Sequence, residues 1–488
     1  MRIRELIKIL NTKKDYSGSS DFQVRGLACN SKDVRGGFVF VAIKGNRDDG
    51  KKFINDAINK GAKAIITGPS AGNIRVPQGV LLVRVNDTRK ALAGLAARFY
   101  KRPSGKLKVV GITGTNGKTT ITYLLEAMLK EKRISPAVVG TINYRFKDKL
   151  IPAKNTTPGP LELQSMFADM LKSNIRYVIM EVSSHALDQD RVAGINFHSA
   201  IFTNLTQDHL DYHKTLEKYF QSKARMFKGL SPDAFAVLNN DDAFSRRLKR
   251  YTRAGIITYG IKNKSDITAR DIRFDCSHTG FKVITPRGEI KIKSPLIGRH
   301  NVYNVLAAFA WGFKAGIALA GIKSAIEKFS FVPGRLEKID TRAGFSVFVD
   351  YAHTEDALAN VINTLRELTR NKIIVVFGCG GERDKAKRPK MGRVVSALSD
   401  YAVITSDNPR SERPQAIIDD IKRGIRKKNF CIIPGRLEAI KKTLAMAHDG
   451  DIVLVAGKGH ENYQILNDKT IHFDDREAVR ECLRSMNY

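Results

Sequence analysis

The chain has 488 residues, 42% of them hydrophobic, which is enough for about three domains with buried cores. Lys and Arg number 83 against 49 Asp and Glu, which gives a formal net charge of +34 at pH 7. No apolar run reaches the length of a membrane-spanning helix, so we expect no membrane association. Residues 1–10 are basic, but charges interrupt their apolar run, which predicts an amphipathic helix rather than a secretory signal.

The positive charge raises nucleic-acid binding as an alternative function. Basic residues are spread along the whole chain, however, and there is one Trp and no aromatic-basic RNA-binding motif. We therefore expect no nucleic-acid partner. The charge either attracts polyanionic substrates or reflects a basic proteome in the source organism, and the second interpretation is slightly favoured.

Residues 1–100 are expected to form a small α/β domain. Short apolar runs at 38–42, 64–67 and 80–83 predict strands, and helical patterns cover 52–60 and 88–100. The segment 100–106 is polar and contains Pro and Gly, so it is a plausible linker. We place the first domain boundary there.

A phosphate-binding loop is expected next, because residues 107–120 run from a β-branched strand through a glycine turn into a helical pattern. Gly114 and Gly117 would let backbone N–H groups face an anion, and the helix adds its positive N-terminus. Lys118 would reach the phosphates and Thr119 would ligate Mg²⁺. The strict motif fails because residue 112 is Ile rather than Gly, so the loop is a variant.

The rest of the chain alternates apolar strands with helices, which indicates largely parallel sheets covered on both faces. In the central domain, 101–330, strands are expected at 109–113, 177–182, 199–204 and 234–239. In the last domain, 331–488, they are expected at 345–350, 373–377, 402–405, 431–433 and 451–455, in a Rossmann-like arrangement. Polar sequences follow most of these strands, and ligands of such sheets bind at the carboxyl ends of the strands.

Five motifs together resemble the ATP-dependent Mur ligases of peptidoglycan synthesis, over essentially the whole chain and in the family's order: Gly114–Thr119, Glu181–His185, Thr203–Asp211, Gly298–Asn301 and Pro333–Glu337. Three further motifs, Asn155–Gly159, Asp350–Thr354 and Asp407–Arg410, resemble the MurE type, which adds the third residue of the stem peptide. The resemblance implies a three-domain α/β protein with a UDP-binding, an ATP-binding and an amino-acid-binding domain.

It also implies the reaction. ATP would phosphorylate the side-chain carboxylate of D-glutamate in UDP-N-acetylmuramoyl-L-alanyl-D-glutamate, and the amine of meso-diaminopimelate would then attack the acyl phosphate. Positioning and charge neutralisation dominate such chemistry. The family positions that would hold ATP are Gly114, Thr115, Asn116, Gly117, Lys118, Thr119, Thr120, Asn301, Arg335 and Asp350.

Two Mg²⁺ ions are implied, the first held by Thr119 and Glu181 and the second by His209 and Lys223, with Lys118, Glu181, His209 and Lys223 catalytic. From the sequence alone, Lys223 looks like an ordinary solvated helix lysine. Similar ligases carry a carbamate derived from CO₂ at this position, which reverses the charge and supplies oxygen ligands.

The remaining family positions divide between the two substrates. Those for the UDP-linked peptide are Ser31, Thr156, Thr157, Ser183, Gln189 and Arg191. Those for diaminopimelate are Arg383, Asp407, Asn408, Pro409, Arg410, Gly457 and Glu461. Arg410 is suited to clamp the carboxylate that diaminopimelate has and lysine lacks, and Glu461 is suited to the far ammonium.

Alternatives are an L-lysine-adding ligase and, more remotely, a folylpolyglutamate synthetase or a basic nucleic-acid-binding NTPase. We expect a cytoplasmic monomer. The five cysteines are scattered and lack metal-ligand or CxxC spacing, as is typical of a reduced compartment: Cys29, Cys276, Cys379, Cys431 and Cys482.

Overall fold

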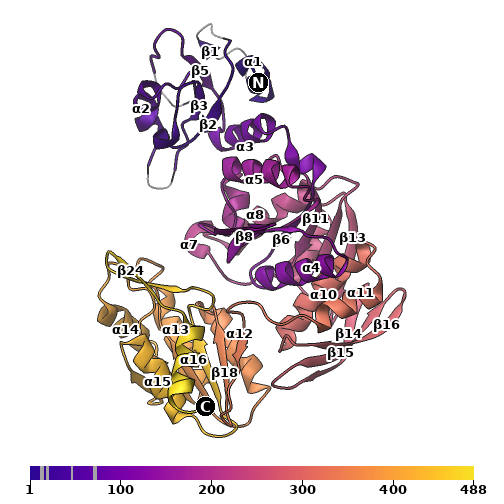
Figure 1. Cartoon of the computed structure of the whole chain (residues 1–488), viewed down its shortest axis with the longest axis vertical. Coiled ribbons are helices and arrows are strands. Elements are labelled where there is room, and N and C mark those ends of the chain that lie inside the picture. Colours follow the sequence, from indigo (N-terminus) through magenta and orange to yellow (C-terminus); the bar gives the residue numbers. More distant parts are fainter. Residues whose placement is uncertain (11–15, 18–20, 46–47, 70–73) are drawn as a thin grey trace.

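The computed structural model describes residues 1–10, 16–17, 21–45, 48–69 and 74–488, and it shows three α/β units in succession along the chain (Figure 1). Each unit is built on its own sheet, as the alternating pattern predicts. The strands of these sheets lie within residues 16–84, 108–294 and 337–456. The exact boundaries at 100 and 330 remain predictions.

The first sheet has the order β1-β5-β4-β3-β2, with β1 antiparallel to its neighbour and the other strands parallel. The predicted strands are confirmed to within one residue, whereas the first helix is shorter than residues 1–10. The elements are α1 (Ile3–Ile7), β1 (Tyr16–Ser17), β2 (Gly26–Ala28), β3 (Phe38–Val41), α2 (Ile54–Asn59), β4 (Ala64–Thr67), β5 (Leu81–Arg84) and α3 (Thr88–Phe99), with 3-10 turns at Lys8–Leu10, Ser31–Asp33, Gly50–Phe53 and Pro103–Lys106.

The central sheet has eleven strands in the order β16-β15-β14-β13-β12-β11-β6-β10-β7-β8-β9. Its strands are β6 (Lys108–Thr113), β7 (Ala137–Val139), β8 (Asn143–Phe146), β9 (Lys149–Pro152), β10 (Tyr177–Glu181), β11 (Phe197–Phe202), β12 (Phe235–Asn239), β13 (Gly255–Gly260), β14 (Ile267–Phe274), β15 (Thr279–Thr285) and β16 (Gly288–Ser294). The run from β14 to β7 is parallel, as expected. Antiparallel strands extend both edges. Neither these strands nor β7, β13 and β14 were predicted from the sequence.

Helices cover both faces of this sheet and divide its core into two layers. One layer includes α4 (Lys118–Glu131), α10 (Arg299–Lys314) and α11 (Leu319–Glu327), and the other includes α5 (Pro160–Lys172) and α8 (Leu216–Lys228). Shorter helices are α6 (Ser184–Asp188), α7 (Leu210–His213) and α9 (Ala243–Leu248). Because β6 lies between β10 and β11, the loops after these three strands meet at one edge.

The third sheet has the order β17-β18-β22-β19-β20-β21, parallel except for β17, and a separate hairpin pairs β23 with β24. Its elements are β17 (Glu337–Ile339), β18 (Ser346–Asp350), α12 (Glu355–Arg366), β19 (Ile373–Phe377), α13 (Lys387–Leu398), β20 (Tyr401–Ile404), α14 (Pro414–Lys422), β21 (Phe430–Ile432), α15 (Arg436–Met446), β22 (Ile452–Ala456), β23 (Tyr463–Leu466), β24 (Lys469–His472) and α16 (Asp475–Ser485). Helices again cover both faces. Among the described residues, no helix is long and apolar enough to cross a membrane.

A buried ion pair joins α15 to α16 in the third unit. Arg436 donates to both carboxylate oxygens of Asp475, at 2.7 and 2.6 Å, and both side chains are fully buried. Removing one partner from such a pair leaves an uncompensated charge in the interior. We expect Asp475→Ala to lower the free energy of unfolding by about 3 kcal/mol.

The exposed pair of Lys172 and Asp169, 3.2 Å apart, provides the control. Asp169→Ala should cost less than about 1 kcal/mol, because water screens exposed pairs. Calorimetric unfolding of the two variants beside the unchanged protein measures both effects. Equal transition temperatures for the two variants would contradict the prediction that the buried pair contributes more to the free energy of unfolding than the exposed pair.

Candidate active site

The predicted phosphate loop is present between β6 and α4, and its glycines are required by the backbone. Gly114 and Gly117 have φ angles of 148° and 88°. A Cβ at Gly114 would lie 1.8 Å from Thr203 Oγ1, and one at Gly117 would lie 2.3 Å from Asn304 Oδ1. The loop is therefore packed tightly against the strand end at 203 and against α10.

Lys118, the first residue of α4, folds back over this loop. Its Nζ donates to the carbonyl oxygens of Gly114 and Thr115, at 3.0 and 2.8 Å. Burial lowers the pKa of Lys118, and the charge of Glu181 partly opposes that effect. The Lys118 ammonium is hydrogen-bonded to neutral carbonyl oxygens, and a phosphate group at the loop would supply a direct anionic partner.

Glu181 is the centre of a hydrogen-bonded cluster at the end of β10 and is almost completely buried. Its Oε2 accepts from Thr119 Oγ1 at 3.0 Å and from Thr141 Oγ1 at 2.9 Å, and its Oε1 accepts from the Thr141 N–H at 3.0 Å. Two predicted ligands of the first metal ion are thus in contact. Thr141, in the turn between β7 and β8, was missed by the sequence analysis.

The expectation that Lys223 resembles a solvated helix lysine is wrong, because α8 buries this side chain almost completely. Nζ donates to Gly114 O at 2.9 Å and lies 4.3 Å from the centre of the Tyr219 ring. Burial, and then the charge of Lys118, hold the pKa of Lys223 well below its ordinary value. The strong apolar face of α8 was a signal that one side of this helix is buried.

His209 precedes α7 with a φ angle of 54° and is 46% exposed, as expected for a loop residue. Its Nε2 lies 3.4 Å from Asp208 Oδ2, and its ring packs edge-on against His185. Burial lowers the pKa of His209, and the charges of Lys118 and Lys223 add to that effect. In the described part of the chain, no three His, Cys, Asp or Glu side chains form a ready metal cluster.

Five of the positions expected to hold the UDP-linked peptide form one connected network. Thr156 Oγ1 lies 3.1 Å from Thr141 Oγ1, and Thr157 Oγ1 donates to Glu181 O at 2.8 Å and lies 3.5 Å from Ser183 Oγ. Arg191 donates to Thr157 O and, twice, to Gln189 Oε1. Ser31 lies apart in the first unit, where its hydrogen bond is the main reason why the pKa of Asp56 is lowered.

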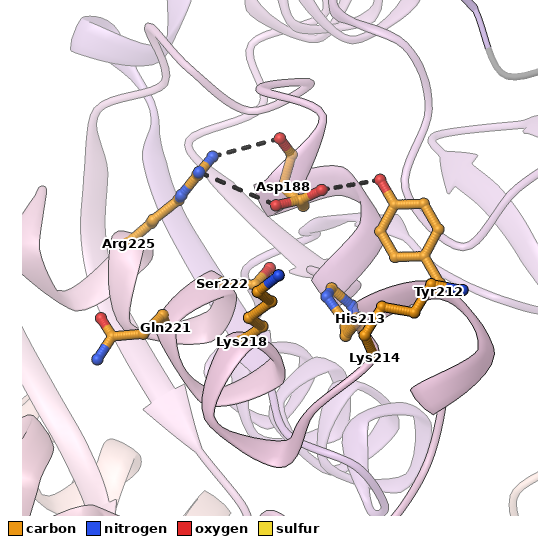
Figure 2. A pocket seen from close by; sticks show the side chains of 8 residues that line it. All are labelled: Asp188, Tyr212, His213, Lys214, Lys218, Gln221, Ser222 and Arg225. Carbon is orange, nitrogen blue, oxygen red and sulfur yellow. Dashed lines mark hydrogen bonds and ion pairs between the residues drawn. The ribbon is translucent and has the colours of Figure 1, made fainter.

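Tyr212 on α7 extends this network and was also missed. Its hydroxyl accepts from Gln189 Nε2 at 3.2 Å and donates to Asp188 Oδ2 at 2.8 Å. Figure 2 shows Tyr212 and Arg225 on opposite sides of Asp188, at a polar pocket of about 270 Å³. The guanidinium of Arg191 is therefore oriented through Gln189 and Tyr212.

Of the three predicted nucleotide contacts outside the loop, Asn301 is connected to it. Asn301 Oδ1 accepts from Asn304 Nδ2 at 2.9 Å, and Asn304 packs on Gly117. Arg335 lies over the Tyr351 ring, 4.7 Å from its centre. Asp350 is buried and accepts from the Leu336 and Ala352 N–H groups; burial raises its pKa, and the charge of Arg335 opposes that rise.

A cavity of about 350 Å³ joins the central and third units. One wall comes from residues 207–211 and includes His209. The other contains six of the seven predicted diaminopimelate positions: Arg383, Asp407, Asn408, Arg410, Gly457 and Glu461. Pro409 does not line this cavity; it lies in the same turn, where its carbonyl oxygen packs against Gly381.

The turn that carries Arg410 is held by the β23–β24 hairpin. Arg410 has a φ angle of 54°, and its backbone exchanges hydrogen bonds with Ile465 and Asn467. Its Nη1 donates to Gly381 O at 2.7 Å. Asn408 donates to Glu461 Oε2 at 3.0 Å and accepts from the Ile465 N–H at 3.0 Å, so its amide already has partners on both sides.

Two further residues of this region were missed. Lys458, within the glycine-rich segment after β22, is completely buried behind the cavity wall. Asp356 Oδ2, on α12, accepts from Asn116 Nδ2 at 3.3 Å and from Thr206 Oγ1 at 3.1 Å, and so joins the third unit to the phosphate loop. The acidic start of α12 was the only signal in the sequence for this contact.

Comparisons with known proteins agree with this arrangement. Three family models match, described as Mur ligase family, catalytic domain (residues 23–100), Mur ligase middle domain (112–312) and Mur ligase, glutamate ligase domain (334–459). A UDP-N-acetylmuramoyl-L-alanyl-D-glutamate–2,6-diaminopimelate ligase of Clostridium tetani is 43% identical, covering 100% of both chains. One from Clostridium acetobutylicum is 45% identical, covering 96% of both.

Solved structures give the same result. A structure with the same ligase title is 33% identical, with a TM-score of 0.70 over 96% of this chain and 98% of its own. A folylpolyglutamate synthase from Mycobacterium tuberculosis, 17% identical with a TM-score of 0.63 over 76% of this chain and 92% of its own, shares the fold. The chain belongs to the Mur ligase family.

Proposed function

We propose that this protein is an ATP-dependent ligase that adds meso-diaminopimelate to the D-glutamate of UDP-N-acetylmuramoyl-L-alanyl-D-glutamate, in peptidoglycan precursor synthesis. The carrying observation is the cavity in which residues 207–211 of the ATP-binding unit face Asp407, Asn408 and Arg410. Full-length relatives that carry this name support the same substrate pair.

The reaction forms one amide bond and converts ATP to ADP and phosphate. The γ-phosphoryl group passes to the D-glutamate carboxylate, and the amine then attacks the acyl carbon and expels phosphate. Lys118 and the turn around Gly114 and Gly117 would hold the γ-phosphate. Asn301, Arg335 and Asp350 are proposed to hold the rest of the nucleotide. Arg335 is suited to this role because its buried Nε has no hydrogen-bond partner among the described residues.

The donors around Glu181 suit a magnesium ion, because a carboxylate and a threonine hydroxyl are the hard oxygen ligands it prefers. Thr119 and Glu181 would hold a first ion, and His209 with carbamylated Lys223 a second. Bound Mg²⁺ would neutralise charge on the phosphates during transfer. Thr141 would keep the Glu181 carboxylate in one orientation through its two hydrogen bonds.

Carbamylation fits the surroundings of Lys223. A neutral amine is the form that attacks CO₂, and burial strongly favours the neutral form of this side chain. The attack forms an N–C bond and releases a proton, leaving an anionic group. That group would give the buried ammonium of Lys118 an anionic neighbour beside the same carbonyl oxygen.

The UDP-linked peptide is proposed to lie along the network of Thr156, Thr157 and Ser183. Arg191 would bind a carboxylate of the substrate, in the orientation given by Gln189. Ser31 would contact the uridine part from the first unit. This assignment places the peptide end beside Glu181, where phosphoryl transfer must occur.

The far head of diaminopimelate is proposed to bind at the third unit. Arg410 and Arg383 would bind its carboxylate, and Glu461, with Asp407, its ammonium. Gly457 and Asn408 complete this wall. An L-lysine-adding ligase is not favoured, because the far end of lysine carries an ammonium but no carboxylate for Arg410. The more remote folylpolyglutamate synthetase has support from fold alone. A cytoplasmic location, a monomeric state and the absence of nucleic-acid partners remain proposals.

The substrate assignment can be tested by phosphate release from ATP in the presence of the UDP-linked dipeptide. We expect turnover with meso-diaminopimelate and at least about a hundredfold lower kcat/KM with L-lysine, because an unpaired Arg410 costs binding energy. Mass spectrometry of the product identifies the added residue. Preference for lysine would overturn the proposal, and ATPase activity stimulated by DNA or RNA would favour the nucleic-acid alternative.

The role of Arg410 predicts an effect on one substrate only. Arg410→Ala should raise the KM for diaminopimelate about a hundredfold, through loss of charge-assisted hydrogen bonds, and change the KM for ATP less than about twofold. Arg410→Lys is the matched control, since it keeps the charge and a side chain at the same positive φ but loses the fork of donors. Similar increases in the KM values for diaminopimelate and ATP in Arg410→Ala would contradict the proposal that Arg410 binds only the amino acid.

The proposed carbamate predicts that Lys223→Ala loses activity and that added acetate or propionate partly restores it. A carboxylate of this size would occupy the space of the missing group. Isotope-labelled bicarbonate gives an independent readout, because the unchanged protein should show a bound carbamate signal by NMR and the variant should not. Full activity of the plain variant, or no labelled signal in the unchanged protein, would rule the carbamate out.

A further inference from the structure

Lys458 is a completely buried ammonium placed behind the amino-acid wall of the cavity. Its Nζ lies 3.8 Å from Asp407 Oδ1, 3.8 Å from Glu461 Oε2 and 3.3 Å from Asn408 Oδ1. It therefore contacts three of the side chains to which diaminopimelate binding is assigned. Neither the family resemblance nor the proposed mechanism gives Lys458 a role.

A buried lysine is costly unless its charge is matched by nearby carboxylates. Burial lowers the pKa of Lys458, and the charges of Asp407 and then Glu461 act in the opposite direction. The neighbouring Arg436 forms its direct buried ion pair with Asp475, and its charge acts on Asp407 and Glu461 only from a greater distance. Lys458 is the cation that stands between Asp407 and Glu461.

The charges of this wall can be counted from these contacts. Around the ammonium, Asp407 and Glu461 contribute two negative charges and Lys458 one positive charge, Arg436 is paired with Asp475, and Arg383 and Arg410 are assigned to the carboxylate of the same head. One negative charge is left for the ligand. The far head of diaminopimelate carries one ammonium beside the carboxylate assigned to the arginines, so the acidic part of the wall matches that ammonium with Lys458 present and exceeds it by one charge without Lys458.

Lys458 also fixes the geometry of the wall. Asn408 Oδ1 accepts from both Lys458 Nζ and the Ile465 N–H, which leaves the Asn408 NH₂ group directed at Glu461. Gly457, just before Lys458, has a φ angle of 114°, and a Cβ there would lie 2.7 Å from Asp407 Oδ2. The backbone thus approaches Asp407 closely enough to place the ammonium behind it.

We propose that Lys458 is a specificity-determining positioning residue for the amino-acid substrate. It neutralises one of the two carboxylates, Asp407 and Glu461, and orients the Asn408 amide, so that the wall presents a single negative charge to the far ammonium. This inference rests on the proposed function for the identity of the amino acid. It assigns Lys458 no contact with the reacting atoms.

The test compares Lys458→Met, Lys458→Arg and the double variant Lys458→Met/Asp407→Asn. Lys458→Met should raise the KM for meso-diaminopimelate about tenfold or more, with the KM for ATP and kcat changed less than about threefold. The double variant should recover most of that loss, because it restores a single negative charge. Lys458→Arg should lie between Lys458→Met and the unchanged protein.

Lys442→Met, which removes an exposed lysine from α15 of the same unit, controls for loss of positive charge alone. Circular dichroism melting shows whether each variant is folded at the assay temperature. If Lys458→Met does not fold, the Arg and double variants carry the same test. Parallel increases in the KM values for both substrates, or additive losses in the double variant, would overturn the inference.

The unchanged protein separates this inference from the proposed function. Turnover with meso-diaminopimelate supports the proposed function whatever the Lys458 variants do. If another amino acid is the substrate, the proposed function fails, and the KM values for that amino acid test Lys458 in the same way. A KM unaffected by Lys458→Met would then overturn the inference as well.

Discussion

The hydrogen bonding of one buried carboxylate, Glu181, ties the ATP-binding unit together at its functional edge. Thr119 reaches it from α4, and Thr141 reaches it from the turn after β7. The carbonyl oxygen of Glu181 in turn accepts from Thr157. A single residue at the end of β10 therefore connects the phosphate loop to the side chains proposed for the acceptor substrate. The phosphoryl group must pass between these two places.

Phosphoryl transfer and amino-acid binding depend on different interactions in the two units. Around Glu181 the protein concentrates oxygen donors and lysines near a phosphate site, so charge neutralisation dominates. The cavity wall of the third unit contains both arginines and carboxylates, which suits an amino-acid head with charges of both signs. The cavity between the units is where an activated carboxylate and an amine can meet.

Much of this arrangement could be predicted from local sequence. The phosphate loop, most of the parallel strands and the polar turns after them follow from glycine spacing and apolar runs, and the structure confirms them. Strands β7, β13 and β14 were missed. The edge strands β8, β9, β15 and β16 were missed too, because partly exposed strands lack continuous apolar runs. The apolar face of α8 indicates that one side of this helix is buried, but the burial of the Lys223 and Lys458 side chains depends on contacts between distant segments. Their proposed roles therefore needed the fold or the family resemblance.

The contact of Asp356 with Asn116 and Thr206 has a thermodynamic consequence. It places a carboxylate of the third unit on the loop where the polyanionic nucleotide is proposed to bind. The orientation of the third unit and the binding of nucleotide at the loop are then linked equilibria. Thermodynamic linkage is reciprocal: if nucleotide binding favours one orientation of the third unit by a given factor, that orientation binds nucleotide more tightly by the same factor. Because the cavity lies between the same two units, amino-acid binding there would be coupled to nucleotide binding through the orientation of the third unit.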